Sequence, residues 1–260
     1  MRAIWSGAIG FGLVNIPVKL YSATQGSELN LDMLDKKDHA KIRFKRVNET
    51  TGKEVQWGDI IKAYKVDDKY VELSDKDFAA AAPAKSKTIE IVEFVNQSEI
   101  DSIYYEVPYY LEPEKSGVRA YALLREALAK SGMVGVSSFV MRTKESLAIL
   151  KPMDEVIVLN RIRFEEEIRS HEELHVPEKT EVKPAELKMA MTLIDQLSGK
   201  FDISQYKDNY SAQLMKVIEA KAKGVKPKVT EMKVVHSKSQ DLMEQLKASL
   251  GEGKKKRKAS

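Results

Sequence analysis

One string in the sequence has the residue types and spacing of a metal hydrolase. HEELH, from His171 to His175, matches H-E-x-x-H, in which two histidines one helical turn apart bind zinc and the glutamate acts as general base. Pro177 biases the preceding residue away from helical geometry, and the flanking segments EEEIRS and VPEK are strongly polar. The remaining histidines, His39 and His236, do not continue the pattern. We expect surface histidines here and keep a zinc hydrolase as an alternative.

Three glycines near the start, Gly7, Gly10 and Gly12, raise the question of a phosphate-binding loop. Such a loop requires a strand before it and a helix after it. Here the residues after Gly12 alternate with period two, which predicts a strand, and Asn15 stands where a third glycine would be needed. We therefore predict that Gly10 and Gly12 form a turn between two strands.

Other enzyme signatures are missing from the sequence. There is no cysteine, no G-x-S-x-G and no G-x-x-x-x-G-K-[ST], so neither a thiol or serine nucleophile nor ATP use is indicated. No cofactor is expected. No apolar stretch approaches the roughly 20 residues that cross a membrane. We expect a cytoplasmic protein without a membrane segment.

Positive charge is concentrated in two places. Residues 36–53 carry seven cations against two carboxylates, and within KIRFKR the cations alternate with Ile42 and Phe44. On a strand, that spacing places Lys41, Arg43 and Lys45 on one face, which suits a phosphate backbone. A solvated strand face is equally compatible with the pattern. The candidate phosphate-binding residues of this run are Lys36, Lys37, Lys41, Arg43, Lys45, Arg46 and Lys53.

The second concentration is the C-terminal end. Residues 221–260 hold twelve Lys and Arg against four Asp and Glu, whereas the preceding residues are net acidic. Such asymmetry is typical of a tail that meets a polyanion, although a solubilising disordered end has the same composition. Its candidate polyanion-binding residues are Lys254, Lys255, Lys256, Arg257 and Lys258.

The elements that would position these residues are mainly short strands. An apolar stripe from Ala120 to Leu128 predicts one amphipathic helix among them, with Ser116 at its start and Gly132 at its end. Many short strands at fairly regular spacing predict a barrel or a sandwich. The predicted strands are 3–23 in two parts, 41–47, 69–73, 88–95, 103–111, 134–142, 146–151 and 155–164.

The chain changes character after residue 183. Pro184 opens a helical stripe that ends at Gly199, and a second stripe runs from Tyr210 to Gly224. Residues 223–239 are predicted to be a linker, and residues 239–250 another short helix. The last ten residues are expected to be disordered.

Several long blocks resemble the bacterial Ku family, in the family's order. These are MRAIWSGAIGFGLVNIPVKLYSAT, IRFKRVNETTGKEVQWGDIIKAY, IEIVEFV, IDSIYYEVPYYLEPEKSGVRAYALLREAL and KMAMTLIDQLSGKFDISQYKDNYSAQLMKVIEAKAKG. The resemblance spans roughly residues 1–224. It implies a mixed, mainly β fold: a β-barrel core with an inserted bridge over 1–183, a helical region over 184–224 and a lysine-rich flexible tail over 225–260.

The resemblance also implies a function. Ku proteins are non-catalytic and bind double-stranded DNA ends, and two subunits form a ring around the duplex in non-homologous end joining. It implies a homodimer that recruits ATP-dependent DNA ligase D, associated with the nucleoid. Many bacterial members carry cysteines in the bridge, suggestive of a zinc ribbon, but this chain reads KRVNET there. The alternatives are a generic architectural DNA-binding protein, acting through its tail, and the zinc hydrolase.

Overall fold

The computed structural model describes residues 1–81, 87–141, 144–176 and 181–226. These residues belong to two compact units. One comprises Met1–Gly26 and Asn30–Ser170, and the other begins at His171 and includes Ser27–Leu29. The predicted helix over 239–250 and the basic tail lie outside the described residues. No helix in the described part is long and apolar enough to cross a bilayer.

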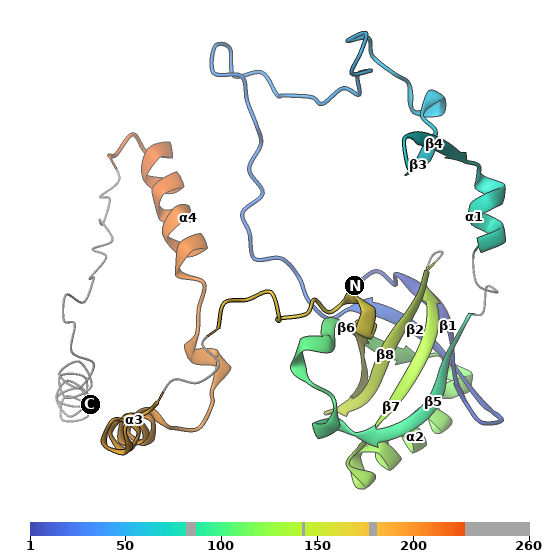
Figure 1. Ribbon diagram of the computed structural model, residues 1–260, viewed down its shortest axis with the longest axis vertical. Helices are drawn as coiled ribbons and strands as arrows, with labels where there is room; N and C mark the ends of the chain where they lie inside the picture. Colours follow the sequence, from blue (N-terminus) through green and yellow to red (C-terminus); the bar gives the residue numbers. More distant parts are fainter. Residues whose placement is uncertain (82–86, 142–143, 177–180, 227–260) are drawn as a thin grey trace. The chain divides into compact units, whose positions relative to one another are not determined.

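Seven strands of the first unit close into a barrel (Figure 1). Around the barrel the order is β1-β2-β6-β9-β8-β7-β5, with β1 parallel to β5 and every other neighbour antiparallel. The predicted β-barrel is confirmed. Its strands are β1 (Trp5–Phe11), β2 (Val14–Ser22), β5 (Thr88–Asn96), β6 (Tyr105–Pro113), β7 (Met133–Met141), β8 (Lys144–Met153) and β9 (Val156–Ile162).

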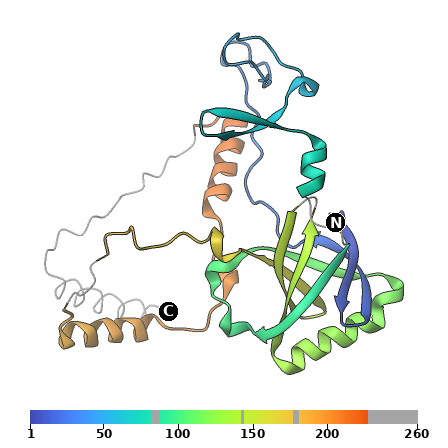
Figure 2. The same ribbon diagram turned by 45° about the vertical axis from the view of Figure 1, so that its right-hand side comes forward.

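The elements between β2 and β5 are short. The strands β3 (Lys62–Val66) and β4 (Lys69–Leu73) pair as a separate antiparallel hairpin, followed by the helix α1 (Asp75–Ala81). Figure 2 shows this hairpin and α1 as a continuous excursion of the chain. Since β3 and β4 carry almost no buried residue, their apolar side chains do not extend the barrel core.

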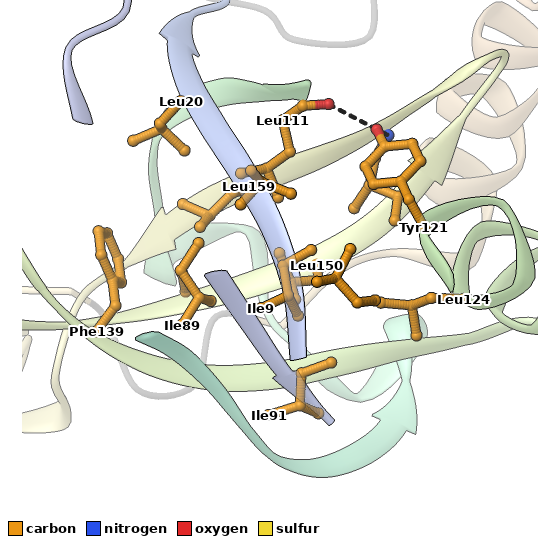
Figure 3. Packing of buried hydrophobic residues seen from close by; sticks show 14 of the residues in the cluster. Ile9, Leu20, Ile89, Ile91, Leu111, Tyr121, Leu124, Phe139, Leu150 and Leu159 are labelled. Atoms are coloured by element: carbon orange, nitrogen blue, oxygen red, sulfur yellow. Dashed lines mark hydrogen bonds between the residues drawn. The ribbon is translucent and has the colours of Figure 1, made fainter. Parts of the chain in front are cut away.

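The barrel core follows from period-two alternation in the sequence. Ile16, Val18 and Leu20 alternate along β2 and are fully buried, as their spacing predicts. They join buried residues of β1, β5, β6, β8 and β9 in one cluster (Figure 3). Each fully buried aliphatic side chain contributes about 1.5–3 kcal/mol to folding, so this cluster is the main stabilising element of the unit.

The glycines near the start have two different roles. Gly12 has φ of 56°, as the first central residue of the two-residue turn between β1 and β2, and the predicted turn is confirmed there. Gly10 is not in the turn but within β1, where the side chain of Glu90 from the parallel neighbour β5 lies over it. A Cβ at position 10 would collide with that carboxylate, which is flexible enough to move aside, and would also lie 2.9 Å from the Cγ2 of Thr88.

The helix α2 (Val118–Ser131) packs against the barrel and adds Tyr121, Leu124 and Leu128 to its core. Gly132 ends it with φ of 68°, as predicted. Its start differs from the prediction: Ser116 lies in a 3-10 turn, Lys115–Gly117, and Gly117 takes the N-cap position without a capping side chain. Gly117 packs closely on Pro17, and a Cβ there would lie 3.0 Å from the Pro17 ring, so a larger residue would require a small shift of the backbone or the ring.

Tyr121 ties α2 to the sheet through its hydroxyl group. The hydroxyl donates to the Leu111 carbonyl at 2.6 Å and accepts from the Ile157 N–H at 2.6 Å (Figure 3). Leu111 and Ile157 face each other across β6 and β9, so the phenol bridges two backbone groups of one ladder. Burial raises the pKa of the Tyr121 phenol, which keeps it protonated as a donor.

Tyr121→Phe is expected to destabilise the barrel by about 1–3 kcal/mol, because a buried carbonyl and a buried N–H both lose their partner. Urea unfolding followed by circular dichroism measures this change. Tyr110→Phe is the matched control, since the structure shows no protein hydrogen bond to its hydroxyl in the described residues. Equal stability of both variants would show that the Tyr121 hydroxyl has no such role.

The second unit contains two described helices, α3 (Pro184–Leu197) and α4 (Asn209–Ala222). Pro184 is the first residue of α3, as predicted. The carboxylate of Asp208 caps α4 by accepting from the N–H groups of Tyr210 at 2.9 Å and Ser211 at 3.2 Å. A hydrogen bond from Ser211 lowers the pKa of this carboxyl group, which favours the ionised form that caps the helix.

Candidate nucleic-acid interface

Seven of the predicted phosphate-binding cations lie on the excursion between β2 and β5. We call residues 30–81 the arm. Where the chain leaves the barrel, the Ala23 N–H donates to the Pro108 carbonyl at 3.2 Å, and where it returns, the Ala8 N–H donates to the Lys87 carbonyl at 2.8 Å. All seven cations are exposed: Lys36, Lys37, Lys41, Arg43, Lys45, Arg46 and Lys53.

Residues 32–54, which we call the basic half of the arm, contain two tight hairpin corners. The first corner closes at Asp35–Ala40, beside a β-bridge between Leu34 and Lys41. The second closes at Asn48–Lys53, beside a bridge between Val47 and Glu54. The predicted strand over 41–47 is therefore wrong: its ends belong to two different hairpins. Alternation alone cannot supply a partner strand, and here only the ends of the segment are bonded, Ile42 to Met33 and Arg46 to Val55.

The two corners bring carboxylates to two of the cations. The ammonium group of Lys41 lies 2.9 Å from the carboxylate of Asp32, and that of Lys45 lies 2.6 Å from Glu54. The guanidinium group of Arg46 lies 4.4 Å from the ring centroid of Trp57, as in a cation–π contact. Three of the seven predicted cations therefore have partners within the arm.

The other four cations, Lys36, Lys37, Arg43 and Lys53, form no ion pair with any described side chain. They offer positive charge to a ligand without first losing an intramolecular partner. The two ion pairs are solvent-exposed and worth about 0.2–1 kcal/mol each, so a phosphate can displace either carboxylate. The basic half of the arm is thus suited to phosphate and has no built pocket for a base.

The remaining predicted DNA-binding residues, Lys254, Lys255, Lys256, Arg257 and Lys258, lie outside the described residues. The sequence prediction for them stays a prediction.

The HEELH string does not have the geometry of a zinc hydrolase. His171 to His175 form a turn, closed by the Leu174 N–H donating to the His171 carbonyl at 3.0 Å, and not a helix. Both histidines are exposed. Across the part of the chain that the structure describes, no three His, Asp or Glu residues gather as metal ligands.

Replacing both His171 and His175 by alanine is expected to leave solubility, stability and DNA binding unchanged, because neither ring is buried or part of a ligand set. Metal analysis by mass spectrometry and a DNA titration check this. Stoichiometric zinc in the native protein that disappears in the double variant would restore the hydrolase alternative.

A hollow of about 590 Å³ lies where α2 meets the barrel. At its rim, the hydroxyl of Tyr21 donates to Glu112 at 2.6 Å, which raises the pKa of this phenol. Arg125 is paired with Glu155 at 2.8 Å. The polar groups at the rim thus satisfy one another.

Sequence reasoning missed the partners of the arm cations and the environment of the C-terminal helices. Glu54 is nine residues from Lys45, and this spacing does not predict an ion pair unless the second corner is known to bring the two residues together. On α3 the predicted apolar residues Leu187, Met191 and Ile194 are half-exposed, so the described residues leave this face uncovered.

Comparison with known proteins gives one consistent result. Residues 10–189 match the family model of the Ku70/Ku80 beta-barrel domain. The chain is 38% identical to the non-homologous end joining protein Ku of Coxiella burnetii, over 99% of this chain and 97% of the relative. It is 39% identical to that of Pseudomonas aeruginosa, over 94% and 85%. It is 41% identical to that of Archaeoglobus fulgidus, over 96% and 98%.

Proposed function

The chain belongs to the Ku family, and from this premise we propose that it binds the ends of double-stranded DNA, without regard to sequence and without catalysis. It acts in non-homologous end-joining repair of double-strand breaks, in the cytoplasm on the nucleoid. The observation that carries the proposal is the exposed basic half of the arm, inserted between two strands of a closed barrel. Its cations face solvent, where a phosphate backbone can reach them.

Sequence independence follows from the type of contact. Hydrogen bonds and ion pairs to phosphate fix a protein on the duplex but carry no sequence information. The seven cations sit on short corners and extended segments, and the helix α1 at the end of the arm carries none of them and has acidic residues in its first turn. Free ends are selected by topology instead, if the protein surrounds the duplex.

The partner that completes the ring is a second copy of the chain. The arm carries many exposed apolar side chains for its length, among them Phe44, Trp57 and Tyr64, each at least 70% exposed. A segment with so much uncovered apolar surface is typical of one that is buried on assembly. Burial against an identical chain gives a closed, two-fold assembly, the commonest form of homo-oligomer.

The uncovered face of α3 supports a further partner. Leu187, Met191 and Ile194 recur at helical spacing and are exposed, as required for docking into an apolar groove of another protein. We assign this face to ATP-dependent DNA ligase D, which the end-joining role requires to seal the break.

The test of the function is a competition between DNA forms. A labelled linear duplex is bound, and unlabelled duplexes of unrelated sequence, linear or closed-circular, are added at equal nucleotide concentration. Linear competitors of every sequence are expected to displace the label equally, and circles far less. Equal competition by circles would instead support a generic architectural DNA-binding protein.

Deleting residues 251–260 is expected to lower affinity without changing the preference for ends, because five adjacent cations meet phosphate anywhere on the duplex. Each phosphate contact contributes about −0.9 to the slope of log K against log salt, so the slope flattens by up to a few units. Titrations between low and physiological salt measure it. An unchanged slope would show that the tail is only a spacer.

A further inference from the structure

The two corners of the arm are copies of one six-residue design. In each, the N–H of the first residue donates to the carbonyl of the sixth at 2.8 Å: Asp35 to Ala40, and Asn48 to Lys53. In each, the N–H of the fifth residue also donates back to the carbonyl of the first, at 2.9 Å in the first corner and 2.8 Å in the second. The fifth residues are His39 and Gly52, and both have positive φ, of 57° and 66°.

Side-chain oxygens close both corners at equivalent positions. In the first corner, Asp35 accepts from the Lys37 N–H at 2.7 Å, and Asp38 accepts from the Ala40 N–H at 2.9 Å. The residues that accept are thus the first and the fourth of the corner. Each oxygen satisfies a backbone donor that the tight turn would otherwise leave to solvent.

The second corner repeats this arrangement. Asn48 accepts from the N–H groups of Thr50 at 3.0 Å and Thr51 at 2.9 Å, and the Thr51 hydroxyl accepts from the Lys53 N–H at 3.4 Å. Again the first and the fourth residues supply the oxygens. In each corner, two residues separate the two side chains that supply oxygens. The paired cysteines of a zinc ribbon, C-x2-C, have the same spacing.

These residues do not fit zinc. Structural zinc sites use thiolate sulfur and imidazole nitrogen, whereas the four positions here are Asp35, Asp38, Asn48 and Thr51. One is a neutral amide and one a neutral hydroxyl, and all four already accept backbone hydrogen bonds. The resemblance implied a metal-bound bridge in many relatives, and in this chain the described residues gather no metal-ligand cluster.

We infer that the arm is a metal-independent counterpart of a zinc ribbon, in which each corner is closed separately by its own side-chain oxygens. Since the chain contains no cysteine, oxidation of thiols cannot open the arm either. A shared metal would couple the two corners, because removing any ligand weakens the site that holds both. If each corner is closed separately, a substitution in one corner leaves the other corner unchanged, and this distinguishes the arm from a metal-bound ribbon.

The experiment uses the full-length ¹⁵N-labelled protein and follows the amide resonances of Lys37, Ala40, Thr50 and Thr51. Asn48→Ala is expected to shift Thr50 and Thr51 and to speed their amide exchange by up to about tenfold, with Lys37 and Ala40 unchanged. Asp35→Ala is expected to affect Lys37 alone among the four. Asp35→Asn keeps an accepting oxygen and should retain the native resonances.

Glu49→Ala is the matched control, because it changes the second corner without removing a closing oxygen. A strong zinc chelator is expected to leave all four resonances in place, and mass spectrometry should find less than one-tenth of a zinc ion per chain. Zinc at one ion per chain, or loss of both corners together on chelation or in either alanine variant, would overturn the inference. These readouts need no DNA, so they are independent of the proposed end binding.

Discussion

Protein loaded onto linear DNA whose two ends are then blocked will stay bound in high salt. If two chains close around the duplex, DNA must thread in from a free end, and bound protein can slide inward because phosphate contacts are equivalent along the helix. An open clamp dissociates when salt screens its ion contacts, since the Debye length falls from about 10 Å at 0.1 M to about 3 Å at 1 M. A threaded ring stays until an end is freed.

The measurement is a pull-down of end-blocked DNA before and after a wash at about 1 M salt, which leaves a Debye length of about 3 Å. Three DNAs are compared: linear with blocks added after loading, the same DNA with blocks added before loading, and a closed circle. Only the linear DNA that was blocked after loading should retain protein through the wash. Cutting this DNA with a restriction enzyme should then release the protein. Retention on the circle, or release from the first DNA without cutting, would contradict a ring.

Reversing the charge of Lys36, Lys37 and Arg43 together is expected to weaken binding on every DNA sequence alike. These cations are exposed and unpaired within the described residues, so they are free to meet phosphate. Losing three contacts should flatten the salt slope by about 2.7 for each protomer that makes them. Fluorescence anisotropy at several salt concentrations measures both affinity and slope, and the arm should keep its structure.

Reversal of Lys41 and Lys45 should behave differently. Each new carboxylate would face Asp32 or Glu54, so repulsion within the arm adds to the lost phosphate contact. Changed amide spectra of the arm, and not only a flatter salt slope, are therefore expected. The charge-matched control is reversal of three exposed cations of the first unit, Lys115, Arg119 and Lys144. A control as damaging as the Lys36, Lys37 and Arg43 variant would rule out a specific role for the arm.

The barrel could be predicted from the sequence because burial imposes a pattern. Ile16, Val18 and Leu20 alternate since every second side chain of β2 enters one core, and Gly132 marks the end of α2 because it must adopt positive φ. The strand β3 and the helix α1 were missed, because neither has a buried residue to impose a periodic signature, whereas the similarly exposed β4 was predicted from its β-forming residues. Local pattern is informative where an element has a buried side.

The candidate site was predictable in its residues but not in its arrangement. The seven arm cations could be named from charge alone, and the structure finds them exposed. The pairing of Lys41 with Asp32 depends on the first corner, and that of Lys45 with Glu54 on the second. Such corners are fixed by backbone N–H groups that donate to single Asp, Asn and Thr side chains, and these residues have no distinctive spacing in a sequence rich in polar residues.

The attachment of the arm has a consequence for how the molecule can vary. Backbone hydrogen bonds hold the chain at the barrel on both sides of the arm, from Ala23 to Pro108 before it and from Ala8 to Lys87 after it, so the barrel is completed whatever lies between them. The entropy lost on closing a flexible loop rises only with the logarithm of its length, by about 0.6 kcal/mol for each doubling. Insertions or deletions in the arm therefore change its reach and its charge while leaving the stability of the barrel nearly unaltered.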